Sequence, residues 1–267
     1  MNKAGQSIGV LTVATNIYIK YWEDMILSLD QVIDEKQRVV SHLFTDQPEL
    51  AKQIGFKLRK IHLNIHQVEP YGWPEATLLR YKIFANKSHV LNEDILMHLD
   101  ADMLVHSDPL PLIITSCLKN DINLVSHPGY WRKDLNILSI LEIRDYLRDK
   151  PRLISLIRRQ PLGAWENNNK SVAYVPKQNR KNYVCGGTWF GNRSEILGLL
   201  TKLSDLTDTD ISNGIIPTWH DESVLNRWAT ENSHGLLPPH LSYVDEYEHL
   251  KSLARIIQAV TKADKTR

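Results

Sequence analysis

The chain has 267 residues, which fits one large α/β domain and does not require a second. Hydrophobic residues make up 42% and charged residues 24%, a composition typical of a globular protein that buries a substantial core. The formal net charge of +1 at pH 7 gives no global field for nucleic acid or an anionic membrane, so an anionic ligand needs local charges or a metal ion.

The N-terminal segment predicts a strand and not a targeting signal. Its apolar stretch is short, is interrupted by Thr and Asn, and has no small-residue cleavage pattern. No run in the chain approaches the roughly 18 apolar residues that a membrane span needs. Two cysteines, Cys117 and Cys185, are too few for a disulfide framework and lack metal-type spacing. We therefore expect a reducing, cytoplasmic setting.

The first third of the chain alternates short apolar runs with segments of helical spacing. Strands are predicted at 8–15, at 38–46, within 56–68 and at 95–100. Helices are predicted from Tyr18 to about Glu35 and from Leu78 to Leu91. Strands alternating with helices indicate βαβ units, and so an α/β fold with a mostly parallel sheet. In such sheets ligands bind beyond the carboxyl ends of the strands.

The middle of the chain contains an unusual segment. Residues 122–131 predict a strand and then a loop. Residues 132–163 have amphipathic helical spacing and more Arg and Lys than acid. They fit a solvated helical hairpin, but also a lid, an acceptor platform or a membrane-surface contact. Without internal repeats or low-complexity linkers, one domain over 1–267 with this helical insertion is the simplest organisation.

A pair of carboxylates follows the predicted strand at 95–100. Asp100 and Asp102 stand one residue apart in the stretch HLDADMLV. In an extended backbone residues i and i+2 point the same way, so both carboxylates would converge on one point. Two hard oxygen ligands beside substrate phosphates suit Mg²⁺ or Mn²⁺. Because an Asp-x-Asp triplet alone is more often a solvated turn, the metal site depends on the position after a buried strand.

A second cluster lies far along the chain. The segment WHDESVLNRW (219–228) places acid, histidine and amide side chains at the start of a helical pattern. It resembles the Trp-His-Asp-Glu-Ser-x-Leu-Asn signature of glycosyltransferase family 6, the family of the histo-blood-group A and B transferases and α-1,3-galactosyltransferase. Without this resemblance, Asp221 and Glu222 would be interpreted as negative charge in the first turn of a helix.

Other segments resemble the same family in the same order. They are LTVATNIY (11–18), HLFTDQP (42–48), WPEATLLRYK (73–82), HLDADM (98–103), SHPGYW (126–131), WENNNKSVAYVP (165–176), NYVCGGTWFGNRSEI (182–196) and LLPPH (236–240). The resemblance covers nearly the whole chain apart from 132–163. It implies a GT-A fold, a Rossmann-like domain with a mixed sheet flanked by helices that binds a nucleotide sugar.

The resemblance also implies an activity. A member of the family transfers galactose or N-acetylgalactosamine from a UDP-sugar to the 3-OH of a galactoside, in an α-1,3 linkage and with retention. The acceptor would be an oligosaccharide or glycolipid, so peripheral membrane contact is compatible with it. Because both aspartates are present, we expect dependence on Mn²⁺, or Mg²⁺, held by Asp100 and Asp102.

The resemblance assigns roles residue by residue. Glu222 is the expected catalytic carboxylate, either as a nucleophile or in a front-face route, and the sequence does not choose between them. The expected donor-binding residues are Thr12, Tyr18, Arg80, Asp100, Asp102, Gly186, Gly187, Asp221 and Lys262 in a basic tail at 250–267. The expected acceptor-binding residues are His127, Trp219 and Glu222. The glycine pair leaves room beside the sugar's C2 position, which favours UDP-GalNAc over UDP-Gal.

Two departures from the family concern the acceptor. The usual acceptor-binding acid has no counterpart in register, Asp245 being one residue away, and the 132–163 segment is additional. Two other functions stay open: a retaining galactosyl- or glucosyltransferase of another GT-A family, and a catalytically silent carbohydrate-binding protein on this scaffold. The paired aspartates also occur in phosphohydrolases, but the further acidic or histidine ligands of such enzymes are not evident.

Overall fold

The computed structural model describes residues 5–133, 149–158 and 161–260. Seven strands form one mixed sheet in the order β3-β2-β1-β4-β7-β6-β8, in which only β7 runs antiparallel to its neighbours. The strands are β1 (Ser7–Val13), β2 (Arg38–Thr45), β3 (Ile61–Gln67), β4 (Ile95–Leu99), β6 (Ile122–Ser126), β7 (Val184–Asn192) and β8 (Gly235–Leu237). This mixed, helix-flanked sheet confirms the predicted α/β class and is consistent with a GT-A-like fold.

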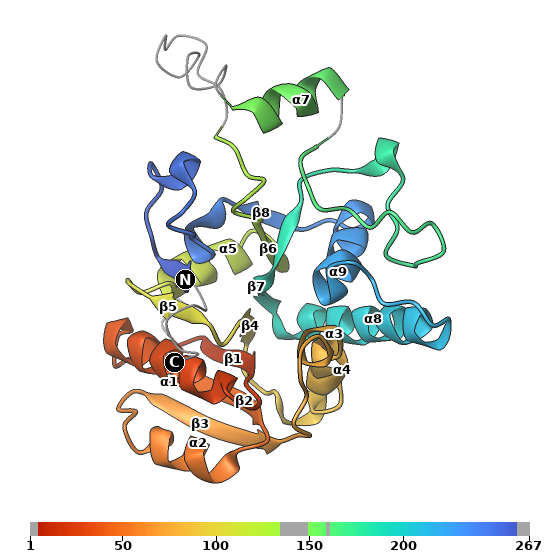
Figure 1. The fold of residues 1–267 in the computed structure, drawn as a ribbon. Helices are drawn as coiled ribbons and strands as arrows, with labels where there is room; N and C mark the ends of the chain where they lie inside the picture. Colours follow the sequence, from red (N-terminus) through yellow and green to blue (C-terminus); the bar gives the residue numbers. More distant parts are fainter. Residues whose placement is uncertain (1–4, 134–148, 159–160, 261–267) are drawn as a thin grey trace.

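Helices cover both faces of the sheet (Figure 1). One face packs against α1 (Tyr18–Val32), α2 (Pro48–Gly55) and α5 (Leu110–Cys117). The other packs against α4 (Arg80–Ala85), α8 (Arg193–Ser212) and α9 (His220–Glu231). Strands buried on both faces need mostly apolar residues, and β1, with the sequence SIGVLTV, is buried from Ser7 to Thr12.

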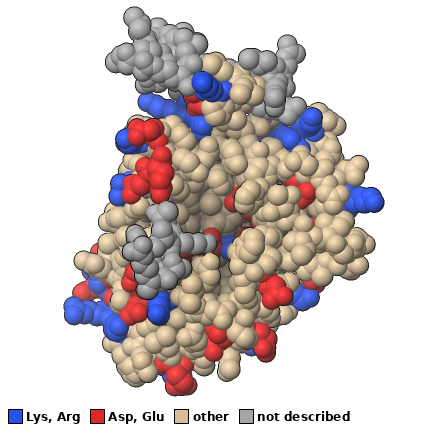
Figure 2. Space-filling view, viewed as in Figure 1, with Lys and Arg blue, Asp and Glu red and all other residues tan. Residues whose placement is uncertain are grey.

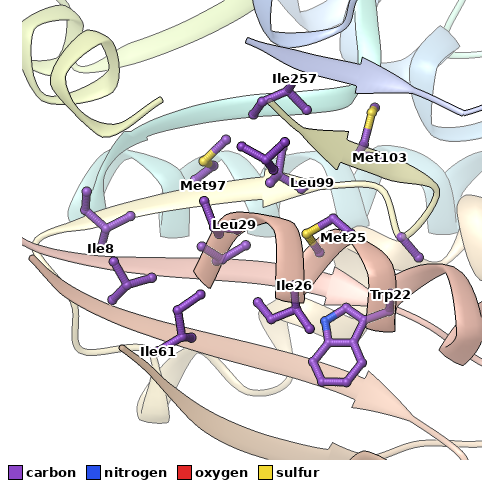
Figure 3. Close-up of a cluster of buried hydrophobic side chains, with 14 of the residues drawn as sticks. Ile8, Trp22, Met25, Ile26, Leu29, Ile61, Met97, Leu99, Met103 and Ile257 are labelled. Carbon is purple, nitrogen blue, oxygen red and sulfur yellow. The ribbon is translucent and has the colours of Figure 1, made fainter. Parts of the chain in front are cut away.

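The first core forms where the predicted helical stripe of α1 meets the sheet. Trp22, Met25 and Leu29 are buried and lie in one cluster with Ile8 and Met97 of the strands (Figure 3). Their spacing of three and four residues places them on one face of the helix. The predictions for β1, α1 and β2 are therefore confirmed within a few residues.

The helix predicted from Leu78 to Leu91 is three short pieces. They are α3 (Glu75–Leu78), α4 and the 3₁₀ turn η1 (Ser88–Val90). Leu79, with φ −95° and ψ 0°, separates α3 from α4, so the prediction of one helix was wrong. The break places Arg80 at the first position of α4, and its side chain is buried against His98 of β4 and Gly186 of β7.

The aspartate pair lies in a turn and not in extended backbone. Asp100 to Asp102 connect β4 to the short strand β5 (Met103–Val105), so the i, i+2 argument for their convergence was wrong. β5 pairs with β9 (Ile257–Ala259) near the end of the described chain. The Val260 amide donates to the Asp102 carbonyl at 2.8 Å, which fixes the C-terminal strand beside this turn.

The predicted insertion is described only in part. Residues 134–148 and 159–160 lie outside the described residues, while α7 (Lys150–Arg158) confirms helical structure in the remainder. The 3₁₀ turns η2 (Lys177–Asn179), η3 (Pro239–Leu241) and η4 (Glu248–Leu250) complete the elements. Within the ranges that the structure describes, no helix combines the length and apolarity that a membrane crossing requires.

Candidate active site

Two adjoining cavities lie beyond the carboxyl ends of β1 and β4, where Figure 2 shows a hollow near the middle of the face. The first, of about 260 Å³, is lined by Val13, Thr15, Asn16, Tyr18, Tyr71, Gly72, Trp73, Ala76, Thr77, Arg80, His98, Asp100, Ala101 and Asp102. The second, of about 210 Å³, is lined by Thr77, Arg80, Asp100, His127, Gly186, Gly187, Trp219, His220, Asp221 and Glu222. The two share Thr77, Arg80 and Asp100, so the sequence-predicted site residues other than Thr12 and Lys262 meet in one place.

Arg80 joins the two carboxylate-bearing segments. Its Nη2 lies 2.8 Å from Oδ1 of Asp100, and its Nη1 lies 3.2 Å from Oδ2 of Asp221. The same Nη1 donates to the Gly186 carbonyl at 3.2 Å. Burial opposes the charge on this guanidinium, but Asp100 and Asp221 more than offset burial and hold the pKa of Arg80 above its usual value. Arg80 therefore couples the Asp100 turn to α9.

His98 was missed by the sequence predictions. Its Nδ1 lies 2.9 Å from the Leu11 carbonyl, which can only accept, so this nitrogen carries the proton. Its Nε2 then accepts from Arg80 Nη1 at 2.7 Å. Burial, with the nearby Arg80 charge, lowers the pKa of His98 and keeps the ring neutral. A polar residue within the apolar run ILMHL was the available signal.

Glu222 has the environment of a carboxyl group that changes charge near neutral pH. The Gly186 amide donates to its Oε2 at 2.8 Å, and the Tyr183 hydroxyl is a further hydrogen-bond partner. Burial, together with the adjacent Asp221, raises the pKa of Glu222 to about 7. Burial also raises the pKa of Asp221 to about 6, although Arg80 opposes the shift. At pH 7 Asp221 is mostly ionised and Glu222 is poised between two states.

Asn226 fixes the position of α9 and so of Glu222. Its Oδ1 accepts from the Val184 amide at 2.8 Å, and its Nδ2 donates to the Val184 carbonyl at 2.9 Å. These two bonds imitate a strand neighbour at the start of β7. Nδ2 also donates to the Glu222 carbonyl one turn earlier, at 2.9 Å. The Asn of the WHDES-x-LN block is thus a positioning residue, a role the sequence did not reveal.

Glu166 fixes the loop that leads into α9. Its Oε2 accepts from the Thr218 amide at 2.6 Å, and its Oε1 accepts from the Asn168 amide at 2.7 Å. His220, the first residue of α9, has φ +48°, a backbone conformation that non-glycine residues rarely adopt. Trp219 before it is 51% exposed at the second cavity. The loop therefore presents an exposed aromatic face beside Glu222.

The two glycines of β7 allow carboxylates to approach the strand. A Cβ at Gly186 would lie 3.0 Å from Cβ of Glu222 and 3.1 Å from Oδ2 of Asp221. A Cβ at Gly187 would lie 2.6 Å from Oδ2 of Asp100. The space expected beside a donor sugar is therefore occupied, at Gly187, by the Asp100 carboxylate. The glycine there is needed first for this close contact.

His127 is neutral and its tautomer is defined. The Gly129 amide donates to its Nδ1 at 3.1 Å, so the proton is on Nε2. Nε2 lies 4.0 Å from Oε1 of Glu222. Burial lowers the pKa of His127 to about 4. Around neutral pH this ring offers a hydrogen-bond donor toward the cavity and cannot take up a proton at Nε2.

The predicted donor-binding residues at the N-terminus separate in the structure. Tyr18 lines the first cavity. Thr12 is fully buried, and its hydroxyl donates to the Leu99 carbonyl at 3.1 Å, so it does not reach the cavity and links β1 to β4 instead. The neighbouring Val13, Thr15 and Asn16 line the cavity in its place. Lys262 lies outside the described residues.

The carboxylates available for a metal ion are few. Asp100 and Asp102 both line the first cavity. Within residues 5–133, 149–158 and 161–260, no three His, Cys, Asp or Glu side chains form a group that could hold a metal. This donor set fits Mg²⁺ or Mn²⁺ as two carboxylates whose remaining ligands come from phosphate oxygens and water, and it does not fit a closed all-protein site.

Comparisons with known proteins give consistent results. Residues 156–266 match the model described as Glycosyltransferase family 6. The chain is 25% identical to histo-blood group ABO system transferase 1 of Rattus norvegicus over 226 residues, 83% of this chain and 56% of that protein. It is 25% identical to globoside alpha-1,3-N-acetylgalactosaminyltransferase 1 of Gallus gallus over 245 residues, 90% of this chain and 62% of that protein.

A bacterial relative matches over nearly its whole length. The chain is 23% identical to the O-antigen biosynthesis glycosyltransferase WbnI of Escherichia coli over 250 residues, 94% of this chain and 93% of that protein. Of the two animal relatives, by contrast, the chain spans only 56% and 62%. The family match and these relatives support a glycosyltransferase. These comparisons agree with the motifs found along the sequence, and they show that the chain is similar to glycosyltransferase family 6.

Proposed function

We propose that this protein is a metal-dependent, retaining glycosyltransferase that moves N-acetylgalactosamine, or galactose, from a UDP-sugar to the 3-OH of a galactoside in an α-1,3 linkage. One observation carries the proposal: Arg80 brings Asp100, from the Asp-x-Asp turn, and Asp221, next to Glu222, to the wall between two adjoining cavities. A nucleotide diphosphate in the first cavity would place its sugar in the second.

The diphosphate would be held by a metal and by fixed charges. Asp100 and Asp102 would bind Mn²⁺ or Mg²⁺, which neutralises the charge that develops on the departing UDP. Tyr18 and the loop at Thr15 and Asn16 would contact the nucleoside, since they line the same cavity. Lys262 would contribute a point charge to the phosphates. The described chain ends two residues before it, at Val260, beside Asp102.

Glu222 would act on the sugar. Glu222 approaches β7 at Gly186, and Asp100 approaches it at Gly187. Because neither glycine has a side chain, both carboxylates can line the same cavity. In its ionised form Glu222 would attack C1 or stabilise positive charge there, and the amide of Gly186 would fix its orientation. Asp221 would accept hydrogen bonds from donor-sugar hydroxyls with the part of its carboxylate that Arg80 does not occupy.

The acceptor would enter from the side of His127 and Trp219. The Nε2–H of His127 would donate to an acceptor hydroxyl beside Glu222, and the exposed ring of Trp219 would stack on the sugar face. The acceptor would be an oligosaccharide or glycolipid. A reducing, cytoplasmic setting is part of the proposal, and the free thiols of Cys117 and Cys185 agree with it.

The preference for N-acetylgalactosamine is supported by the relatives more than by the cavity. The relative from Gallus gallus is named for that sugar. The Gly186–Gly187 pair keeps side chains out of the second cavity, although Asp100 occupies part of the space. We therefore expect UDP-GalNAc to be used faster than UDP-Gal.

UDP release tests the proposal. The protein is incubated with UDP-GalNAc, UDP-Gal or UDP-Glc, with Mn²⁺ or EDTA, and with fucosylated and unfucosylated galactosides. We expect metal-stimulated release that is largest with UDP-GalNAc, and Asp102→Asn should abolish either the metal stimulation or the activity. Activity unchanged by EDTA would contradict metal dependence, and no release from any donor would contradict the transferase.

A further inference from the structure

A third cavity lies between α7 and the body of the protein, near β6 and β8. Its volume is about 390 Å³, within the range of about 300–1,000 Å³ of small-molecule sites. It is lined by residues of the loop at 127–131, called here the His-Pro-Gly loop, of α7 and of the segments before β7 and after β8, among them Tyr130, Trp131, Ser155, Asn182, Tyr183 and Pro238. None of these contributes to the two cavities described above.

An aromatic wall separates the third cavity from Glu222. His127 packs against Tyr130 with ring centroids 4.8 Å apart, and Tyr130 meets Tyr183 edge-on at 5.3 Å. His127 faces Glu222, and the Tyr183 hydroxyl is a hydrogen-bond partner of that carboxyl group. Tyr130 and Tyr183 also line the third cavity. This cavity therefore begins one aromatic layer away from the reacting centre.

The lining has the chemistry of a site for uncharged sugars. Tyr130 and Trp131 offer flat apolar faces, and Ser155 and Asn182 offer hydrogen-bonding groups. Two arginines also line the cavity, and both are engaged. Arg132 forms an ion pair with Asp149 and donates to the Trp131 carbonyl, and Arg152 has an interaction of its own. An anion would therefore compete with existing partners at either guanidinium.

The third cavity exists because of the additional segment. Asp149 and α7 belong to residues 132–163, the part of the chain outside the family's motifs. Arg132 links this segment to the His-Pro-Gly loop by donating to the Gly129 carbonyl at 3.0 Å. The His249 ring donates to the Pro128 carbonyl at 2.8 Å from the other side. The loop that carries His127 and the added helix are therefore braced as one wall.

We propose that the third cavity binds the sugar residues of the acceptor that lie beyond the galactoside being modified, so that the physiological acceptor is an extended, largely uncharged oligosaccharide. The inference rests on the proposed function, because it takes His127 and Glu222 as the site of the accepting hydroxyl. It assigns α7 the role of an acceptor platform.

Acceptor length tests this inference. Transfer from the best donor is measured with methyl β-galactoside and with the tetrasaccharide lacto-N-neotetraose as acceptors. We expect kcat/KM for the tetrasaccharide to exceed that for the monosaccharide by at least about 10-fold. Ser155→Trp fills the third cavity and should remove this advantage, while kcat/KM for the monosaccharide stays within about twofold.

The control is the residue before Ser155 on the same helix. Ile154 is 48% exposed and does not line the third cavity, so Ile154→Trp should leave both acceptors unaffected. Equal kcat/KM for the two acceptors, or an equal loss on both in Ser155→Trp, would overturn the inference and leave the proposed function intact. No transfer to either acceptor by the unaltered protein would overturn the proposed function, and the inference with it.

Discussion

Two glutamates, the half-buried Glu222 and the buried Glu93, take opposite pKa shifts. Burial alone would raise the pKa of both carboxyl groups. At Glu93 the hydrogen bond from His42 Nε2, 3.0 Å away, and nearby backbone amides outweigh burial and lower the pKa below its usual value. At Glu222 the adjacent Asp221 adds to burial, and the pKa rises to about 7. The same side chain is held ionised in one region and poised in the other.

The surroundings explain the difference. His42 is fully buried, and its Nδ1 also lies 3.0 Å from Nε2 of His66. Glu93, His42 and His66 therefore form a hydrogen-bonded network whose members are one another's partners. None of the three lines any of the three cavities described above. Around Glu222, by contrast, the charged side chains of Arg80, Asp100 and Asp221 line the same cavity. A closed network stabilises the fold, whereas an open one keeps interactions available for a ligand.

The largest expected effect is at Glu222. We expect Glu222→Gln to lower kcat by at least about 1,000-fold, with donor binding changed only a few-fold, because the amide keeps the bond from Gly186 but loses the charge. Single-turnover transfer and donor titration measure the two quantities. Glu93→Gln is the matched control and should keep near-normal kcat. Equal losses in the two variants would remove the distinction between the regions.

The next effect is at Arg80. Arg80→Met leaves Asp100 and Asp221 without their shared partner, so we expect a loss of about 100-fold in kcat/KM for the donor. Because the guanidinium and the Asp221 carboxylate are both buried, unfolding free energy should fall by roughly 3–5 kcal/mol. Urea denaturation and initial rates measure these quantities. Unchanged kinetics with reduced stability would make Arg80 purely structural.

A smaller effect is expected at Gly187. Gly187→Ala places a Cβ against the Asp100 carboxylate, so it should lower kcat about 10-fold or more with every donor. Gly198, in α8, has no atom within 4 Å of a Cβ added there, and Gly198→Ala should keep normal activity. The ratio of rates with UDP-GalNAc and UDP-Gal is measured in both variants. A full-rate enzyme with a reversed ratio would show that Gly187 acts through donor specificity alone.

The smallest expected effect is the change of kcat/KM with pH. If the ionised form of Glu222 is active, kcat/KM falls as pH drops through its pKa, to about half its maximum at pH 7 and about a tenth at pH 6. Protonation of Asp221, near pH 6, would steepen the fall further. Initial rates at low donor concentration between pH 5.5 and 8.5 give the profile. A rate that rises toward acid pH would require the protonated carboxyl group instead.

Sequence patterns predicted what depends on local periodicity. The apolar runs of β1 and β4 and the stripe on α1 follow from burial, and the structure confirms them. The helix break at Leu79 and the turn at Asp100–Asp102 depend on tertiary contacts, and both were missed. The contact between Arg80 and Asp221, 141 residues apart, has no local signal; the family resemblance gave both as donor-binding residues but did not predict their ion pair.

The central claim is that Glu222 serves a retaining transfer at the cavity shared by Arg80 and Asp100. The anomeric configuration of the first-formed product from UDP-GalNAc and a β-galactoside, read from the H1–H2 coupling by NMR, tests it most directly. The α-linked product, with the configuration of the donor, is predicted for the unaltered protein. A β-linked product would contradict the account, since inversion needs a base that activates the acceptor and no carboxylate acting at C1.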